Sequence, residues 1–114
     1  MKGWIGVDLD GTLAHYDGWV DELHIGAPIL PMVERVHAWL NEGREVRIFT
    51  ARVWAGGGRD VALVREAIRK WCIEHIGVAL HVTCEKDYGM IELWDDRCVR
   101  VVINTGKPCC GEQA

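Results

Sequence analysis

The stretch WIGVDLDGT, residues 4–12, decides the fold and carries the first chemical signal of this chain. Its apolar start predicts a buried strand over Trp4–Asp8, and Gly11 allows the backbone to turn sharply after it. Because successive side chains of a strand point to opposite faces, Asp8 and Asp10 point to the same side. Two converging carboxylates repel each other unless a proton or a cation lies between them, so the pattern suits a divalent metal beside a carboxylate nucleophile.

A calcium-binding EF-hand loop is the obvious competing interpretation of the two aspartates. A loop starting at Asp8 would need glycine and glutamate at positions that are Leu13 and Trp19 in this chain. The spacing therefore excludes an EF-hand. A solvated acidic turn remains an alternative on the short motif alone, because short motifs often mislead.

Composition limits the class of protein. The 114 residues suffice for one domain with one core, and 49% hydrophobic with 26% charged residues is the balance of a globular protein. The net charge of −4 gives no general attraction to nucleic acid or to an anionic membrane. No segment has the length of a membrane span, and the five cysteines are scattered without CxxC spacing. We expect a cytoplasmic protein with buried thiols and no membrane partner.

Apolar stretches alternate along the chain with helical patterns, which predicts an α/β protein with a parallel sheet. Val33, Val36 and Leu40, for example, recur at the spacing of a helix with one buried face. In chain order the predicted elements are a strand over Trp4–Asp8, a short flap over 13–27, a helix from Pro28 to Gly43, a strand over Glu45–Phe49, a helix over Asp60–His75, strands over Leu80–Val82, Met90–Trp94 and Val99–Ile103, and a loose tail over 104–114.

Polar residues suited to chemistry follow three of the predicted strands. Asp8 and Asp10 end the first strand, Thr50 follows the second, and Asp95-Asp96 follow the strand that begins near Met90. In a doubly wound sheet, sites form at the carboxyl ends of the strands. Because these residues all follow the ends of predicted strands, we expect them to form one site.

Four motifs, in order, resemble the haloacid dehalogenase superfamily of phosphotransferases over residues 3–105. They are Asp8-Leu9-Asp10-Gly11-Thr12, Ile48-Phe49-Thr50-Ala51-Arg52, Lys86, and Trp94-Asp95-Asp96-Arg97. The chain is most similar to small phage- and bacterial-type members that carry an Asp-Asp-Arg motif. It departs from many members at Trp94, where they have glycine. The resemblance implies a single three-layer Rossmann-like domain over residues 1–114, with a central parallel sheet.

The resemblance also implies a magnesium-dependent phosphomonoester hydrolase. Asp8 would attack phosphorus and form an aspartyl phosphate, a role in which an ionised carboxylate needs no activating base. Asp10 would protonate the leaving oxygen and then accept a proton from water, and the neighbouring negative charge of Asp8 favours a carboxyl that can hold a proton. Magnesium would be held by Asp8, the Asp10 carbonyl and Asp95, with Asp96 as a second ligand or an orienting residue.

The same resemblance assigns the phosphate-binding groups. Thr50 would donate a hydrogen bond to a phosphoryl oxygen, and Lys86 would stabilise the charge on nucleophile and phosphate. Lys70 is a rival for that role but lies within the second predicted helix. Arg52 and Arg97 are equally suited to contact phosphate or to form ion pairs with the acidic residues.

Neither 13–27 nor Val53–Arg59 is long enough to hold a cap domain, so we predict an open site. Such a site admits a large substrate, or a second subunit can close it in a homo-oligomer. Tyr16 and Trp19, with His15, are candidates for substrate contact, and packing of Trp19 over the sheet edge is an equal alternative. Most of the six tryptophans are expected in the core, and His37 and His75 are expected to be surface or packing residues.

Several functions stay open at this stage. We expect a phosphorylated small molecule, such as a nucleotide or a sugar phosphate, as the substrate. A nucleic-acid end is less favoured, because the chain is acidic and has no basic, aromatic-rich stripe. The alternatives are a non-catalytic protein that binds metal or phosphate on the same fold, and phosphoryl transfer to an acceptor other than water.

Overall fold

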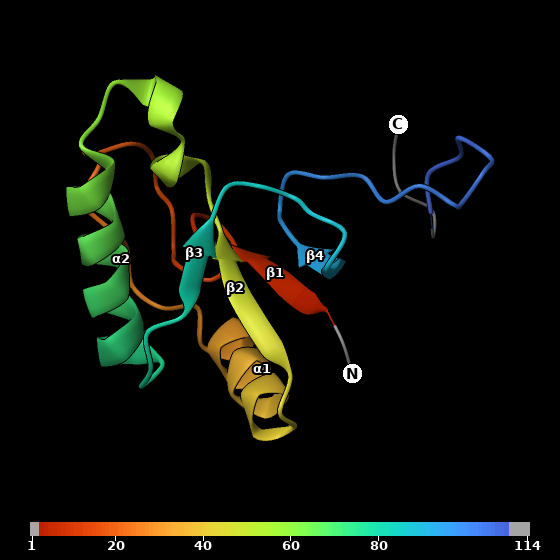
Figure 1. Ribbon diagram of the computed structural model, residues 1–114, viewed down its shortest axis with the longest axis horizontal. Coiled ribbons are helices and arrows are strands. Elements are labelled where there is room, and N and C mark those ends of the chain that lie inside the picture. The colour runs from red at the N-terminus through yellow and green to blue at the C-terminus, as the bar shows by residue number, and fades with distance from the viewer. Residues whose placement is uncertain (1–2, 110–114) are drawn as a thin grey trace.

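The computed structural model describes residues 3–109 and shows a Rossmann-like α/β fold (Figure 1). Its sheet has four parallel strands in the order β3-β2-β1-β4. The predicted α/β class with a central parallel sheet is therefore confirmed. The elements are β1 (Trp4–Asp8), α1 (Leu30–Asn41), β2 (Glu45–Phe49), the 3-10 turns η1 (Ala51–Val53) and η2 (Ala55–Gly57), α2 (Val61–His75), β3 (His81–Thr83) and β4 (Met90–Trp94).

The hydrophobic core lies between one face of the sheet and both helices. Ile5 pairs in register with Val46, and Val7 with Ile48, so these four side chains share a face. They form one buried cluster with residues of both helices, among them Val33, Val36, Val64 and Ile68. Full burial of such a side chain stabilises the fold by about 1.5–3 kcal/mol. This packing holds the strand that carries Asp8.

The opposite face of the sheet is covered by the segment 84–89, which connects β3 on one edge with β4 on the other. Trp4 lies beneath it: its backbone N–H donates to Gly89 O at 2.7 Å, and its indole Nε1 donates to Asp87 Oδ1 at 2.8 Å. The Arg47 guanidinium stacks 4.5 Å from the centroid of the Trp4 ring. Within residues 3–109 the layer on this face is therefore a short crossing segment and contains no helix.

Both predicted helices are present, and their ends follow local chemistry. Asp60 caps α2, since its Oδ1 accepts from the N–H groups of Ala62 and Leu63 at 3.1 and 3.3 Å. At the start of α1 a proline occupies the first turn, where it costs no helical hydrogen bond. In the part of the chain that the structure describes, neither helix has the length and apolarity needed to cross a bilayer.

The prediction of a last strand over Val99–Ile103 was wrong. Val101 forms only an isolated antiparallel bridge with Pro108, and the segment after β4 extends away from the sheet (Figure 1). Its apolar side chains are exposed, to 82% at Ile103, because within residues 3–109 no neighbouring strand or core covers them. The predicted tail over 104–114 is described only as far as Cys109, and Cys110 lies outside the described residues.

The tryptophan side chains divide between the surface and the interior. Trp19 and Trp54 are exposed to 53% and 58%. Four tryptophans do contribute to packing, as predicted: Trp4, Trp39, Trp71 and Trp94. Among the thiols, Cys72 is buried and its burial raises its pKa, whereas Cys98 is exposed. His37 contacts Ile76 O at 2.7 Å, which agrees with a packing role.

Candidate active site

Three carboxylates meet where β1 and β4 end. Asp8 is the last residue of β1, and Asp95 and Asp96 directly follow β4, its neighbour in the sheet. One oxygen atom from each of the three lies within 4.8 Å of the others. Carboxylate oxygens are the ligands preferred by hard divalent cations such as Mg²⁺. The donor set therefore fits the predicted metal.

The turn after β1 positions Asp96. Thr12 Oγ1 lies 3.0 Å from Asp96 Oδ1 and 3.4 Å from Asp8 Oδ2, and it accepts a hydrogen bond from the Asp96 N–H at 3.0 Å. Its single proton serves one carboxylate at a time. Thr12 belongs to the first motif, but no role was predicted for it from the sequence. A hydroxyl two residues after the second aspartate was the available signal.

Two features of the structure favour glycine at position 11. Its φ of 90° is a conformation that L side chains rarely adopt. A Cβ atom at this position would also lie 2.6 Å from Asp96 Oδ2. The sharp turn predicted at Gly11 is thus present, and it is what allows Asp96 to approach the end of β1.

The crowding of carboxylates changes the protonation of Asp8. Burial, a hydrogen bond with Asp96, and the charges of Asp95, Asp96 and Asp10 together raise the pKa of Asp8 to about 8. Burial alone would also raise the pKa of Asp96, but hydrogen bonds with Asp8 and Thr12 and the charge of Arg97 lower it overall. Without a cation, Asp8 holds a proton at neutral pH. A cation beside it would favour the ionised form.

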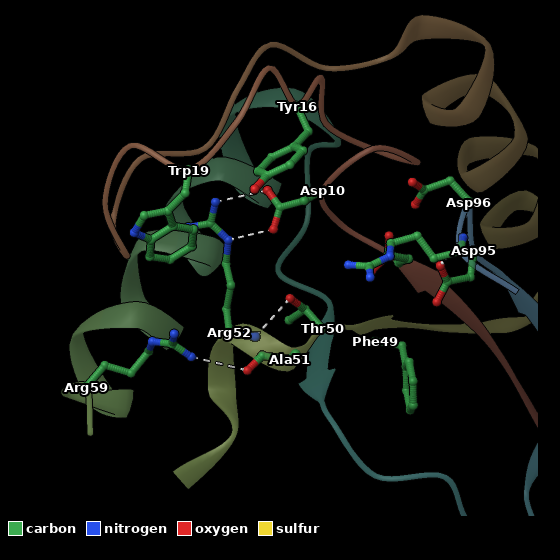
Figure 2. A pocket seen from close by; sticks show the side chains of 12 residues that line it. Asp10, Tyr16, Trp19, Phe49, Thr50, Ala51, Arg52, Arg59, Asp95 and Asp96 are labelled. Carbon is green, nitrogen blue, oxygen red and sulfur yellow. Dashed lines mark hydrogen bonds and ion pairs between the residues drawn. The ribbon is translucent and has the colours of Figure 1, made fainter. Parts of the chain in front are cut away.

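Asp10 is held by an arginine (Figure 2). Arg52 donates from Nε to Asp10 Oδ2 at 2.7 Å and from Nη2 to Asp10 Oδ1 at 2.9 Å. Its Nη1 donates to Glu22 O at 2.9 Å, which ties the flap to η1. Since Arg52 is buried and each of its three guanidinium nitrogens donates a hydrogen bond, this is a rigid charge-assisted contact. Of the two roles left open for Arg52, the structure shows the ion pair.

Thr50 lies at the carboxyl end of β2 and starts η1. Its Oγ1 accepts from the Arg52 N–H at 3.2 Å, and its own N–H donates to Thr83 O at 2.9 Å. The hydroxyl proton is thereby left for an acceptor in the cavity. This placement agrees with the predicted contact to a phosphoryl oxygen.

A cavity of about 470 Å³ joins these groups. Ligand sites for small molecules typically have volumes of about 300–1,000 Å³. The cavity brings together the predicted site residues except Lys86 and the flap residue His15. Its lining comprises Asp8, Asp10, Tyr16, Trp19, Phe49, Thr50, Ala51, Arg52, Arg59, Asp95, Asp96 and Arg97.

Lys86 is exposed and does not line the cavity. It belongs to the segment 84–89, which leaves the carboxyl edge of β3 and crosses the second face toward the start of β4. The positive charges that do line the cavity are those of Arg52, Arg59 and Arg97. Arg97 was predicted from the sequence as a candidate for phosphate contact, whereas no role was predicted for Arg59.

Comparisons with known proteins address the fold. No protein-family model and no curated protein matches the chain. A solved structure, described as that of a conserved protein coded by locus from Bacteroides thetaiotaomicron, is similar with a TM-score of 0.58 and 24% identity. The similarity covers 87% of this chain and 79% of that chain. At this identity it supports the α/β fold alone.

Proposed function

We propose that this chain is a magnesium-dependent phosphomonoester hydrolase of the haloacid dehalogenase type that acts through an aspartyl phosphate on Asp8. The observation that carries the proposal is the convergence of Asp8, Asp95 and Asp96 oxygens within 4.8 Å, in a cavity that also contains Thr50 and Arg97. The order of the four motifs along the chain supports it independently.

The three carboxylates fit Mg²⁺ through the chemistry of their oxygen donors. A bound ion would supply positive charge beside Asp8 and the substrate phosphate, and so favour the ionised nucleophile. Uncompensated carboxylate charges, which contribute to the raised pKa of Asp8, destabilise a protein. Their presence at one strand edge therefore favours a cation-binding role over a purely structural one.

In the first step, an Asp8 oxygen attacks phosphorus and the bond between phosphorus and the ester oxygen breaks. The departing alkoxide takes a proton from Asp10. The Thr50 hydroxyl donates to a phosphoryl oxygen, and Arg97 adds positive charge at the cavity wall.

In the second step, water attacks the phosphorus of the aspartyl phosphate. Asp10 accepts the proton of that water, the bond between phosphorus and the Asp8 oxygen breaks, and inorganic phosphate leaves. Asp8 is regenerated as a carboxylate. The net reaction converts a phosphomonoester and water into an alcohol and phosphate.

The test is hydrolysis of an aryl phosphate by the natural protein and by Asp8→Asn, each with and without Mg²⁺. We expect turnover only with both Asp8 and Mg²⁺, and a loss of roughly 10³-fold or more in the variant. Thermal unfolding of Asp8→Asn controls for misfolding. Acetyl phosphate should add one phosphoryl group to Asp8, which mass spectrometry would locate.

Two results would count against the proposal. Full metal-dependent turnover by Asp8→Asn would exclude the covalent mechanism. Binding of Mg²⁺ in calorimetry, with neither ester turnover nor labelling by acetyl phosphate, would identify a metal-binding protein without this activity.

A further inference from the structure

The flap 13–27 presents two aromatic side chains to the cavity (Figure 2). Tyr16 is 47% exposed and Trp19 is 53% exposed, although both belong to the largest apolar side chains. Aromatic rings that are about half exposed at a cavity wall are available for contact with a ligand. The predicted alternative, in which Trp19 packs over the sheet edge, does not describe its position among the cavity residues.

Trp19 is supported from within the protein by cations. The guanidinium carbons of Arg52 and Arg59 lie 5.2 and 5.6 Å from the centroid of its ring. Arg52 is itself fixed by Asp10 and by the Glu22 carbonyl, so the ring rests on a rigid base. A ring held in this way loses little conformational entropy when a ligand stacks on it.

Arg59 adds hydrogen-bond donors beside the ring. Its Nη1 contacts Ala51 O at 3.5 Å, and within residues 3–109 it forms no ion pair with a carboxylate. Guanidinium groups and indole rings together bind flat heteroaromatic rings by stacking and by cation–π contact. Such rings are found in nucleobases and are missing from simple sugar phosphates.

We propose that the substrate is a nucleoside monophosphate whose base stacks on Trp19 beside Arg59, while its phosphate lies at Asp8, Asp95 and Asp96. This inference rests on the proposed function and names its substrate class. Hydrolysis would give the nucleoside and inorganic phosphate. The carboxylates and the aromatic wall line the same cavity of about 470 Å³, so a single small ligand can contact both.

The first experiment compares hydrolysis of nucleoside monophosphates with that of ribose 5-phosphate, which lacks the base. Stacking of one base predicts a kcat/KM roughly ten-fold or more in favour of the nucleotides. Trp19→Ala should lower the ratio of kcat/KM for nucleotides to kcat/KM for ribose 5-phosphate by about the same factor. Trp19→Phe should keep most of the preference, because it retains an aromatic face. Trp54→Ala is the matched control, since Trp54 is equally exposed but does not line the cavity.

A binding measurement separates this inference from the proposed chemistry. Calorimetry with Asp8→Asn and Mg²⁺ should show nucleoside monophosphates binding about ten-fold more tightly than ribose 5-phosphate, with the difference lost in Asp8→Asn combined with Trp19→Ala. Nucleotide binding without phosphatase activity in the natural protein would support the base site and contradict the proposed function.

Three results would overturn the substrate class. Aryl phosphate turnover with no preference for nucleotides would leave the phosphatase proposal standing and exclude the base site. An unchanged nucleotide preference in Trp19→Ala would show that Trp19 only supports the flap. A preference of more than about ten-fold for a 5′-phosphorylated oligonucleotide over the mononucleotide would identify a nucleic-acid end as the substrate.

Discussion

The two sides of the cavity are built on opposite electrostatic principles (Figure 2). On one side Asp8, Asp95 and Asp96 repel one another, and burial together with a hydrogen bond to Asp96 and these charges raises the pKa of Asp8 to about 8. On the other side Asp10 is paired with Arg52, whose guanidinium also supports the Trp19 ring. If the proposed cation binds, we expect it to stabilise the carboxylate side, whereas the Arg52–Asp10 ion pair is formed without a ligand. The proposed site therefore combines a part that its ligand would stabilise with a part that is fixed beforehand.

The largest expected effect comes from removing a ligand on the carboxylate side. Asp95→Asn should lower Mg²⁺-dependent hydrolysis by roughly 10²–10³-fold, because several kcal/mol of charge stabilisation depend on the ion. Initial rates across a Mg²⁺ titration would measure both the loss and any shift in the ion concentration required. Glu34→Gln, an exposed carboxylate on α1, is the control for a general charge effect. Equal rates in Asp95→Asn and the natural protein would show that Asp95 holds no catalytic ion.

Removing the ion pair on the arginine side should lower the free energy of unfolding. Arg52→Met leaves Asp10 without its partner in a largely buried pair, which typically costs about 3–5 kcal/mol. Urea unfolding followed by circular dichroism would measure the change. Arg52→Lys should recover only part of it, because an ammonium group cannot form the two parallel hydrogen bonds of the fork. A loss below about 1 kcal/mol for Arg52→Met would mean that the pair contributes no more than a surface ion pair.

A smaller effect should link the backbone turn to the carboxylate side. Gly11→Ala places a methyl group at positive φ against Asp96, with a conformational cost of about 1–2 kcal/mol. We also expect weaker Mg²⁺ binding, because Asp96 has to move. Gly43→Ala is the matched control: its φ is 79°, and no atom lies within 4 Å of the added methyl group.

Calorimetric Mg²⁺ titrations would measure the ion affinity of Gly11→Ala and Gly43→Ala, and urea unfolding would measure their stability. The control should lose stability and keep its affinity for the ion. Equal Mg²⁺ affinity in Gly11→Ala and Gly43→Ala would contradict the steric role of Gly11.

The smallest effect is a pH dependence of stability in the absence of a cation. The pKa of Asp8 is raised to about 8 in the folded state, so the folded protein binds this proton more tightly than the unfolded chain does. The stability contributed by the proton on Asp8 is therefore fully present below the unfolded pKa of about 4, and it is lost as the pH rises toward 8. Partial exposure of Asp8 to solvent reduces the size of the effect.

Thermal unfolding between pH 5 and pH 8, with a chelator present, would measure this dependence. Asp8→Asn should have a flatter profile, and saturating Mg²⁺ should flatten that of the natural protein. A natural protein whose melting temperature rises with pH over this range, relative to Asp8→Asn, would contradict the raised pKa of Asp8.

Most regular elements could be predicted from the sequence because they depend on local patterns. The apolar spacing of Val33, Val36 and Leu40 specifies α1 wherever the helix finally packs. The strands β1, β2 and β4 agree in their bounds with the predicted ranges. Val99–Ile103 has a similar apolar pattern and failed as a strand, since a strand also needs a neighbour to pair with.

The candidate site was predictable in part for the same reason. Residues that follow parallel strands meet at one edge, so Asp8, Thr50 and Asp95 could be grouped before their distances were known. Lys86 was predicted at this site from the order of the motifs. In the structure it belongs to the segment 84–89 between β3 and β4 and does not line the cavity. The alternation of elements does not encode the direction in which a connecting segment leaves its strand.

The sequence by itself therefore determined the α/β class, the positions of the strand ends and the carboxylates that stand on them, because periodicity and turn chemistry act over a few residues. Only the tertiary structure decided that β4 lies beside β1, that Arg52 pairs with Asp10, and that Trp19 faces the cavity. Each of these joins segments distant along the chain. Such contacts depend on how the whole chain packs, and no local pattern of residues specifies them.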